Sequence, residues 1–419
     1  MIPSLGMGTA PIGNLYRAVS DAEARVTLDA AWDAGIRYYD TAPHYGFGLA
    51  ERRLGAMLAA RDPAGEAVLS TKAGRLLVPT DATGERHGFV NADPYEPVFD
   101  YGHDAVVRSF EGSCARLGRD WIDLLLAHDL GQATHGDDHE RHLRAFLNGG
   151  YRAMCDLRDA GAIGAIGIGV NEVAICDEIL DHVALDMILL AGRYTLLDRS
   201  AERLLARCAA LGVQVIVGGP YNSGILARDL TGPLHFDYAA PSADILDKAQ
   251  RLSDACAALD IPLPAAALQF PLRHPAVVSV IPGLVGADQV ADTMTRLSTP
   301  LPDPLWPALD ASLKDTAMVQ DDARLILLHP DDNVLICVRS IEAGDILPVS
   351  GGTIPAREGI AIGHKIARAS LSAGDKVIKY GAPIGSMTAD ATAGDWVHMH
   401  NMKSDYISSH TRTALEEGT

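Results

Sequence analysis

The stretch Gly-Ile-Arg-Tyr-Tyr-Asp-Thr-Ala-Pro-His-Tyr-Gly, residues 35–46, decides how the first part of this chain is interpreted. A glycine opens it, a short apolar segment follows, and the segment closes on Asp40, with Tyr45 five residues later. Two later apolar segments also close on a polar side chain, Lys72 in one and His128 in the other. If these segments are neighbouring parallel strands, the four groups meet at one mouth of a barrel, where chemistry occurs in such folds.

Short apolar segments alternate with amphipathic helical patterns from residue 5 to about residue 297. The pattern at 21–34 is typical of the helices, with Ser20 as N-cap and Gly35 as stop. Such alternation implies right-handed βαβ units, and eight of them make an α/β fold of the (β/α)8 TIM barrel type. A doubly wound sheet is the alternative, but no Gly-x-Gly-x-x-Gly follows the first strand. The expected strands are 5–9, 36–40, 68–72, 122–128, 165–170, 187–191, 213–218 and 277–281.

The last quarter of the chain has a different texture, in which strand-like segments dominate. Ala-Gly-Asp occurs three times, at 343–345, 373–375 and 393–395, and each copy is predicted to be a tight turn with Gly supplying the unusual backbone angle. The strands expected here are 325–329, 334–338, 360–363, 376–380 and 396–400. The predicted domains are a barrel over 1–299, a Pro-rich linker with a short helix over 300–324, and a small all-β domain over 325–419.

Composition excludes several classes of partner. The net charge of −19 and the pI near 5.1 argue against nucleic acid and anionic membrane surfaces. No apolar segment reaches the ~18 residues that a membrane-spanning helix needs. The first residues do not resemble a signal peptide, and the six scattered cysteines form no Cys-x-x-Cys pair. We therefore expect a reduced, cytoplasmic protein.

Residues 40–46, the Ser-Thr-Lys that ends at Lys72, and His128 together resemble the aldo-keto reductase superfamily. Within it the chain is most similar to the aldose 1-dehydrogenases that act on L-fucose, L-galactose or D-threo-aldoses. The resemblance implies that Tyr45 is the acid/base and that Lys72 makes its phenolate accessible. It also implies that Asp40 holds the lysine, and that His128 orients the substrate oxygen and helps to carry the proton. The supporting stretches are 100–101, 116–118, 167–172, 191–194 and 220–226.

The same resemblance implies a nicotinamide cofactor. Asn171 would hold its carboxamide, and Gly-rich turns would approach its pyrophosphate through backbone amides. Where many relatives have a stacking Tyr this chain has Gly218, so Tyr221 or Tyr194 must substitute. Val285 stands where NADP-preferring relatives carry a basic residue, which favours NAD, with NADP as the alternative. The other expected cofactor residues are Gly219, Asn222, Ser223 and Gly224 at the pyrophosphate, and Pro282, Gly283, Gln289 and Asp292 at the adenosine end.

The tail from 325 to about 404 resembles the small SAF-like (β-clip) domain of the altronate and galactarate dehydratase family. The matching stretches are 329–334, 363–367, 378–381, 384–385 and 397–401. His398 and His400 lie two apart on an expected strand and would face one side, but two histidines do not complete a metal site, so no metal is predicted. The large catalytic domain of that family is absent from the sequence, so a separate dehydratase large subunit is the partner to consider.

The leading interpretation is NAD(P)-dependent oxidation of an aldose at C1 to the aldonolactone. One alternative is a small subunit of a sugar-acid dehydratase, with the barrel as an accessory reductase. Another is a barrel that only binds nicotinamide cofactor, as a redox sensor or docking partner. The sugar and the oligomeric state stay open, including a homo-oligomer, because specificity lies in long loops with no readable code: 74–101, 131–150 and 226–240.

Overall fold

The computed structural model describes residues 2–228, 230, 234–237, 239–313, 324–329, 331–349 and 352–405. The expected linker and the loop at 226–240 lie partly outside these residues, as does the end of the tail. The chain divides into two compact units, Met1–Leu313 and Lys314–Thr419. No helix in the described part of the chain is both long enough and apolar enough to cross a membrane.

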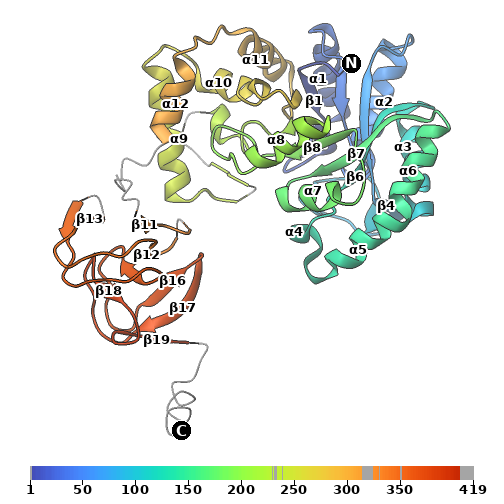
Figure 1. Ribbon diagram of the computed structural model, residues 1–419. Helices are drawn as coiled ribbons and strands as arrows, with labels where there is room; N and C mark the ends of the chain where they lie inside the picture. The colour runs from blue at the N-terminus through green and yellow to red at the C-terminus, as the bar shows by residue number, and fades with distance from the viewer. Residues whose placement is uncertain are drawn as a thin grey trace, which may run out of the picture. The chain divides into compact units, whose positions relative to one another are not determined.

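The first unit is built on eight parallel strands, and helices surround them (Figure 1). Neighbouring strands pair in chain order, and bridges from Leu5 to Val280 and from Gly8 to Gly283 join the first strand to the last. The TIM barrel expected from the sequence is therefore confirmed. Its strands are β1 (Gly6–Gly8), β2 (Tyr38–Asp40), β3 (Val68–Ala73), β6 (Ile122–His128), β7 (Ile163–Val170), β8 (Met187–Ala191), β9 (Gln214–Gly218) and β10 (Val277–Ile281).

The local signals that start and stop the helices act as expected. Ser20 Oγ accepts the Glu23 N–H at 3.1 Å and caps α1 (Asp21–Asp33). Gly35, which follows that helix, has a φ of +88°, a conformation that glycine adopts without strain. The main outer helices are α1, α2 (Leu49–Arg61), α3 (His103–Leu117), α6 (Tyr151–Asp159), α7 (Val173–Leu180), α8 (Glu202–Leu211), α9 (Ala243–Ala257), α10 (Leu263–Gln269) and α11 (Ala287–Ser298).

Two apolar layers hold the barrel together. The larger layer lies between strands and helices. The smaller one comprises buried strand residues: Tyr38, Leu124, Leu126, Met187, Leu189, Ile216 and Ile281. A rigid frame of this kind fixes where each strand ends, and so fixes the side chains at the mouth.

A hairpin that was not predicted follows β3. Strands β4 (Arg75–Pro79) and β5 (Tyr95–Phe99) pair antiparallel inside the stretch expected to be a loop. Gly74, with a φ of +107°, turns the chain into the hairpin, and a Cβ there would lie 2.2 Å from the ring of Tyr101. Short segments also follow β6: α4 (Gln132–His135), α5 (His139–Ala145) and a π-helical turn, η3 (Phe146–Gly150).

Part of the expected linker is helical. Helix α12 (Leu305–Leu313) buries Leu305 and Leu309 in the core of the first unit. It packs against α9, so this part of the chain belongs to the barrel unit. The domain limits drawn from the sequence stay a prediction.

The second unit is all-β in its described residues, as expected. The predicted turns are confirmed: Gly344, Gly374 and Gly394 have φ values of +90°, +97° and +87°. In each copy the Asp carboxylate accepts the N–H three residues earlier, at 2.7–2.9 Å. The strands are β11 (Leu325–Ile326), β12 (Val334–Cys337), β13 (Ile346–Val349), β14 (Gly352–Pro355), β15 (Lys365–Ala367), β16 (Lys376–Lys379), β17 (Ala382–Met387), β18 (Trp396–Val397) and β19 (Met402–Ser404).

One of the strands expected in the tail, 360–363, is wrong, and another, 396–400, is shorter than expected. Residues 360–363 form a single bridge, Ile341 to Ile360, followed by a turn, and the strand begins at Lys365. Strand β18 ends at Val397, because the amide of Asn401 folds the chain back. Its Oδ1 accepts the His398 N–H at 2.9 Å and its Nδ2 donates to the Trp396 carbonyl at 2.8 Å.

Candidate active site

Lys72, at the end of β3, links the polar groups of the barrel mouth. Its Nζ lies 3.0 and 2.9 Å from the two carboxylate oxygens of Asp40, which ends β2. It lies 3.0 Å from the hydroxyl oxygen of Tyr45, in the loop after β2. Lys72 and Asp40 are each only 2 % exposed, so the pair is held in a low-dielectric surrounding.

His128, at the end of β6, completes the group. Its ring centroid lies 6.0 Å from that of Tyr45, edge to face. The structure thus brings together the four residues that the sequence placed at strand ends. Their catalytic roles stay a prediction.

The pKa of Tyr45 does not follow the expectation that Lys72 makes its phenolate accessible. Burial raises the pKa of Tyr45 to about 12, and the opposing effect of Lys72 does not offset it. Burial alone would lower the pKa of Lys72, but Asp40 and Tyr45 raise it above its ordinary value. Tyr45 is therefore protonated and Lys72 charged at neutral pH when only the protein is considered.

His128 is held neutral. Burial lowers its pKa well below the ordinary value, and the positive charges of Arg75 and Lys72 act in the same direction. A neutral imidazole donates one hydrogen bond and carries no extra proton. Orientation of an oxygen is thus compatible with this state, whereas the expected share in carrying the proton is not favoured.

Arg75 and Asp129 also lie at this mouth, and the sequence did not single them out. Arg75 opens β4 and donates to Asp129 Oδ2 and to His44 Nε2, the latter at 3.1 Å. Asp129 follows His128 directly, and its Oδ2 lies 3.4 Å from His128 Nε2. Burial, together with Arg75 and other cations, lowers the pKa of His44 to about 2. The one sequence signal that could have indicated this pair is Asp129 itself, a charged residue directly after the strand-end His128.

Tyr101 fixes the main chain at this point. Its hydroxyl lies 2.6 Å from the His128 carbonyl oxygen and 3.2 Å from that of Asp129. Asp129 has a φ of +49°, a strained conformation for a residue with a side chain. The hydrogen bonds from Tyr101 thus help to fix the main chain that carries the Asp129 carboxylate.

The residues expected to bind cofactor follow β7, β9 and β10. The turn after β9 has positive φ at four of them: Gly219, Asn222, Ser223 and Gly224. The amides of Asn222 and Gly224 donate within the turn, at 3.0 Å each. Asn222 Oδ1 accepts from Thr195 and its Nδ2 donates to the Gly192 carbonyl, so its side chain joins the turn to the segment after β8. Fewer amides than expected are thus available for a phosphate.

Gly192, Gly218 and Gly219 lie at the ends of β8 and β9 and carry no side chain. A Cβ on Gly218 would be in van der Waals contact with the side chains of Ala191 and Leu189 at 3.4 Å, and a Cβ on Gly219 would lie 3.9 Å from the Gly192 amide nitrogen. Positions without a Cβ suit the close approach of a flat ring and a pyrophosphate, so the residues present fit a dinucleotide.

The remaining cofactor candidates have local contacts. Gln289 Oε1 accepts the Val285 N–H at 3.0 Å. Asp292 is largely exposed and lies 3.8 Å from Arg296, which approaches the ring of Tyr221 at 5.6 Å. The Pro282 carbonyl and Gly283 join the first strand near Gly8, and Asn171 accepts from Arg193 at its carbonyl.

Both aromatic candidates for nicotinamide stacking make contacts with other residues. The ring of Tyr194 packs on Phe270 at 5.1 Å and on His274 at 5.9 Å. The ring of Tyr221 lies under the Arg296 guanidinium. The expected substitute for the missing Tyr stays a prediction.

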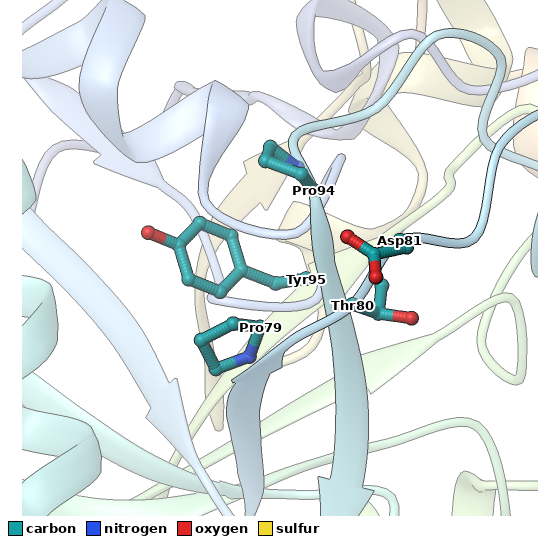
Figure 2. Close-up of a pocket in the computed structure, with 5 residues that line it drawn as sticks. All are labelled: Pro79, Thr80, Asp81, Pro94 and Tyr95. Carbon is teal, nitrogen blue, oxygen red and sulfur yellow. The ribbon is translucent and has the colours of Figure 1, made fainter.

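A hollow of about 390 Å³ lies at the far end of the β4–β5 hairpin (Figure 2). Its lining residues are Pro79, Thr80, Asp81, Pro94 and Tyr95. Polar atoms that could act on a carbonyl are concentrated instead at the base of the hairpin, beside Arg75.

In the second unit, the two histidines of the tail pack on one tryptophan. The His398 ring stacks on Trp396 at 5.2 Å, and His400 is tilted against it at 5.1 Å. Trp396 Nε1 donates to His364 Nδ1 at 3.1 Å. The expectation that His398 and His400 share a strand face is wrong, since both lie in the turn after β18. In the described residues no group of three or more His, Cys, Asp or Glu could hold a metal ion.

Comparisons with known proteins agree with this geometry. The aldo/keto reductase family model matches residues 4–314, and the altronate/galactarate dehydratase SAF domain matches residues 323–405. The chain is 43% identical to pyridoxal 4-dehydrogenase of Microbacterium luteolum, over 74% of this chain and 93% of that protein. It is 39% identical to D-threo-aldose 1-dehydrogenase of a Pseudomonas species, over the same shares.

Two further matches concern the separate units. A holo-form structure of an aldo-keto reductase from Bacillus halodurans has a TM-score of 0.58 at 25% identity, covering 74% of this chain and 91% of that one. The tail is 40% identical over 80 residues to altronate dehydratase of Bacillus subtilis. Those residues are 19% of this chain and 16% of that enzyme.

Proposed function

Because the chain belongs to the aldo/keto reductase family, we propose that it is an NAD(P)-dependent dehydrogenase that oxidises an aldose at C1 to the aldonolactone. The observation that carries the proposal is the buried contact of Lys72 Nζ with both Asp40 and Tyr45, beside His128. A redox sensor or docking module would not need a phenol held in this way.

The four residues divide the work of one proton transfer. In its phenolate form Tyr45 takes the proton of the C1 hydroxyl, and Lys72 stabilises that phenolate. Asp40 keeps Lys72 charged and fixed in position. His128, as a neutral donor, orients the reacting oxygen. The oxidised nicotinamide, when bound, accepts the hydride that leaves C1.

The cofactor would lie across the ends of β7, β9 and β10. We assign its carboxamide to Asn171, its pyrophosphate to the turn at Gly219–Gly224, and its adenosine end to the residues around Gln289. NAD is the preferred form, because Val285 supplies no cation for a 2′-phosphate and Asp292 partly neutralises Arg296.

The substrate class follows from chemistry that two relatives share. An aldose closes onto its own hydroxyl as a cyclic hemiacetal, and so does pyridoxal. Oxidation of either hemiacetal carbon gives a lactone. Pyridoxal is therefore the second candidate, favoured by the 43% identity to pyridoxal 4-dehydrogenase.

A substrate screen tests the proposal. Purified full-length protein is offered a panel of aldoses and pyridoxal, each with NAD and with NADP. Reduced cofactor is followed by absorbance and the lactone by mass spectrometry. The proposal predicts at least one aldose with a higher kcat/KM than pyridoxal. Oxidation of pyridoxal alone would transfer the assignment to the second candidate.

For the second unit we propose a docking role toward a separate sugar-acid dehydratase chain. The matched 80 residues are 16% of altronate dehydratase, so most of that enzyme has no counterpart here. Co-purification of the full chain with a dehydratase large subunit tests this, with a chain ending at Leu313 as control. Dehydration of an aldonate by the full chain alone would overturn it.

A further inference from the structure

A chain of polar groups extends from the proposed catalytic histidine toward the β4–β5 hairpin. Asp129 Oδ2 lies 3.4 Å from His128 Nε2 and accepts a hydrogen bond from Arg75. Arg75 then donates to His44 Nε2 at 3.1 Å. The His44 ring centroid lies 6.0 Å from that of His128, so the last of these polar groups also lies at the barrel mouth. Each of these groups thus lies beside His128 or is linked to it through Asp129.

Several buried nitrogen atoms in this group have no hydrogen-bond partner among the described residues. A guanidinium only donates, so His44 Nε2 must accept, and the proton of neutral His44 is on Nδ1. This Nδ1 is buried and has no hydrogen-bond partner among the described residues. The same holds for Arg75 Nε and for Nδ1 of His128, which is 6 % exposed. Buried polar atoms are nearly always paired in native proteins, so three unpaired ones in one cluster point to a polar ligand.

The shape of the main chain supports a ligand rather than a purely structural ion pair. Asp129 keeps a φ of +49° that costs energy, and the Tyr101 hydroxyl holds the main chain there. Strain of this kind persists where a side chain must be aimed. The Asp129 side chain remains 20% exposed. It is thus still able to meet a further partner.

We propose that Arg75, Asp129 and His44 form a subsite that binds the hydroxyl group on the carbon next to the reacting carbon of the substrate. The proposal rests on the function proposed above, and it names the substrate group that the site recognises. Asp129 accepts a hydrogen bond from this hydroxyl, while Arg75 and His44 donate hydrogen bonds to its oxygen. Sites built to hydrogen-bond a hydroxyl reject analogues that lack it, because their buried polar groups are then unpaired. The substrates selected are 2-hydroxy aldehydes in free or hemiacetal form.

Matched substrate pairs test the subsite. In oxidation, the best aldose from the screen is compared with its 2-deoxy counterpart. In reduction with NADH, glyceraldehyde is compared with 3-hydroxypropanal, which lacks the hydroxyl on the neighbouring carbon. The wild-type protein should favour the hydroxylated member in kcat/KM by on the order of 10²-fold or more.

Three variants and one control separate recognition from stability. Asp129→Asn, which keeps the side-chain shape, should lower this preference about tenfold or more, mainly through KM. Arg75→Met and His44→Phe should act in the same direction. Asp93→Asn is the control: Asp93 pairs with Arg52 at 2.9 Å, lies in the loop between β4 and β5, and has a side chain that is 22% exposed, close to the exposure of Asp129. It should leave the preference unchanged. Circular dichroism and NADH titration check that each variant folds and binds cofactor.

Each outcome has a defined meaning. Equal losses with both members of a pair in all three variants would show a structural ion pair and overturn the inference. A wild-type protein without hydroxyl preference would overturn it as well. If no aldose is oxidised but glyceraldehyde is reduced in preference to 3-hydroxypropanal, and this preference depends on Asp129, the subsite stands while the proposed oxidation at C1 fails.

Discussion

The Nζ of Lys72 lies 3.0 Å from the hydroxyl oxygen of Tyr45, yet the pKa of that phenol is raised to about 12. Burial thus outweighs the neighbouring positive charge. The lysine limits the increase without reversing it, because Asp40 balances much of its charge at 2.9 Å. This relationship makes direct predictions about turnover and its pH dependence.

Replacing Tyr45 with Phe should abolish most turnover while cofactor still binds. The variant removes the proton acceptor and little volume, and loss of general acid/base catalysis costs ~10²–10⁴-fold in rate. Steady-state assays measure kcat, and NADH titration measures cofactor affinity. Near-normal kcat would exclude Tyr45 as the acid/base.

Oxidation should accelerate as pH rises from 7 to 10. The raised pKa of Tyr45 leaves little phenolate at neutral pH. While pH stays below that pKa, each unit by which pH rises increases the phenolate fraction about tenfold. Reduction uses the protonated phenol and should not gain over the same range. Lys72→Met should shift the rising limb to still higher pH, because a positive charge that lowers the phenol pKa is removed. A flat oxidation profile in the wild-type protein would contradict the proton-transfer role.

The protein should prefer NAD, and Val285→Arg should shift the preference toward NADP by about tenfold or more in kcat/KM. A guanidinium at this position supplies the missing partner for a 2′-phosphate. Val285→Met is the control for side-chain size. A wild-type preference for NADP would identify another cation, with Arg296 as the first to test.

A chain ending at Leu313 should fold and oxidise the same substrate with kcat and KM within about threefold of the full chain. Helix α12 ends there, and its Leu305 and Leu309 belong to the barrel core. Thermal unfolding and kinetics check the result. Ending the chain at Ser298 instead should destabilise the barrel, since two buried leucines would be lost. If the Leu313 chain cannot bind NADH, the second unit takes part in the cofactor site.

Much of the barrel could be predicted from the sequence because each parallel strand is a continuous apolar segment between helices. Segments such as 122–128 and 187–191 match their strands residue for residue. The hairpin β4–β5 could not be predicted in this way. Strand β5 contains Glu96 and Pro97, and a long polar loop joins it to β4, so neither alternation nor a short turn signal is present.

The candidate active site likewise contains residues that the sequence predicts and residues that it does not. Asp40, Lys72 and His128 were found because a strand end is visible in the sequence. Arg75 and Asp129 were missed because their pairing depends on a hairpin folding back to the neighbouring strand end. The turn at His398 was missed because its hydrogen bonds come from the side chain of Asn401, which no periodicity reveals.

The three Ala-Gly-Asp turns of the second unit share one hydrogen-bond pattern, but different residues follow each of them. Only the third is followed by Trp396 and the histidines that pack on it; the first leads to Ile346 and the second to Lys376. Because glycine and aspartate set the geometry of each turn, the residues that follow can differ from copy to copy while the turn is kept. Changes after the third turn can therefore alter the aromatic cluster without altering the hydrogen bonds of the turn that precedes it.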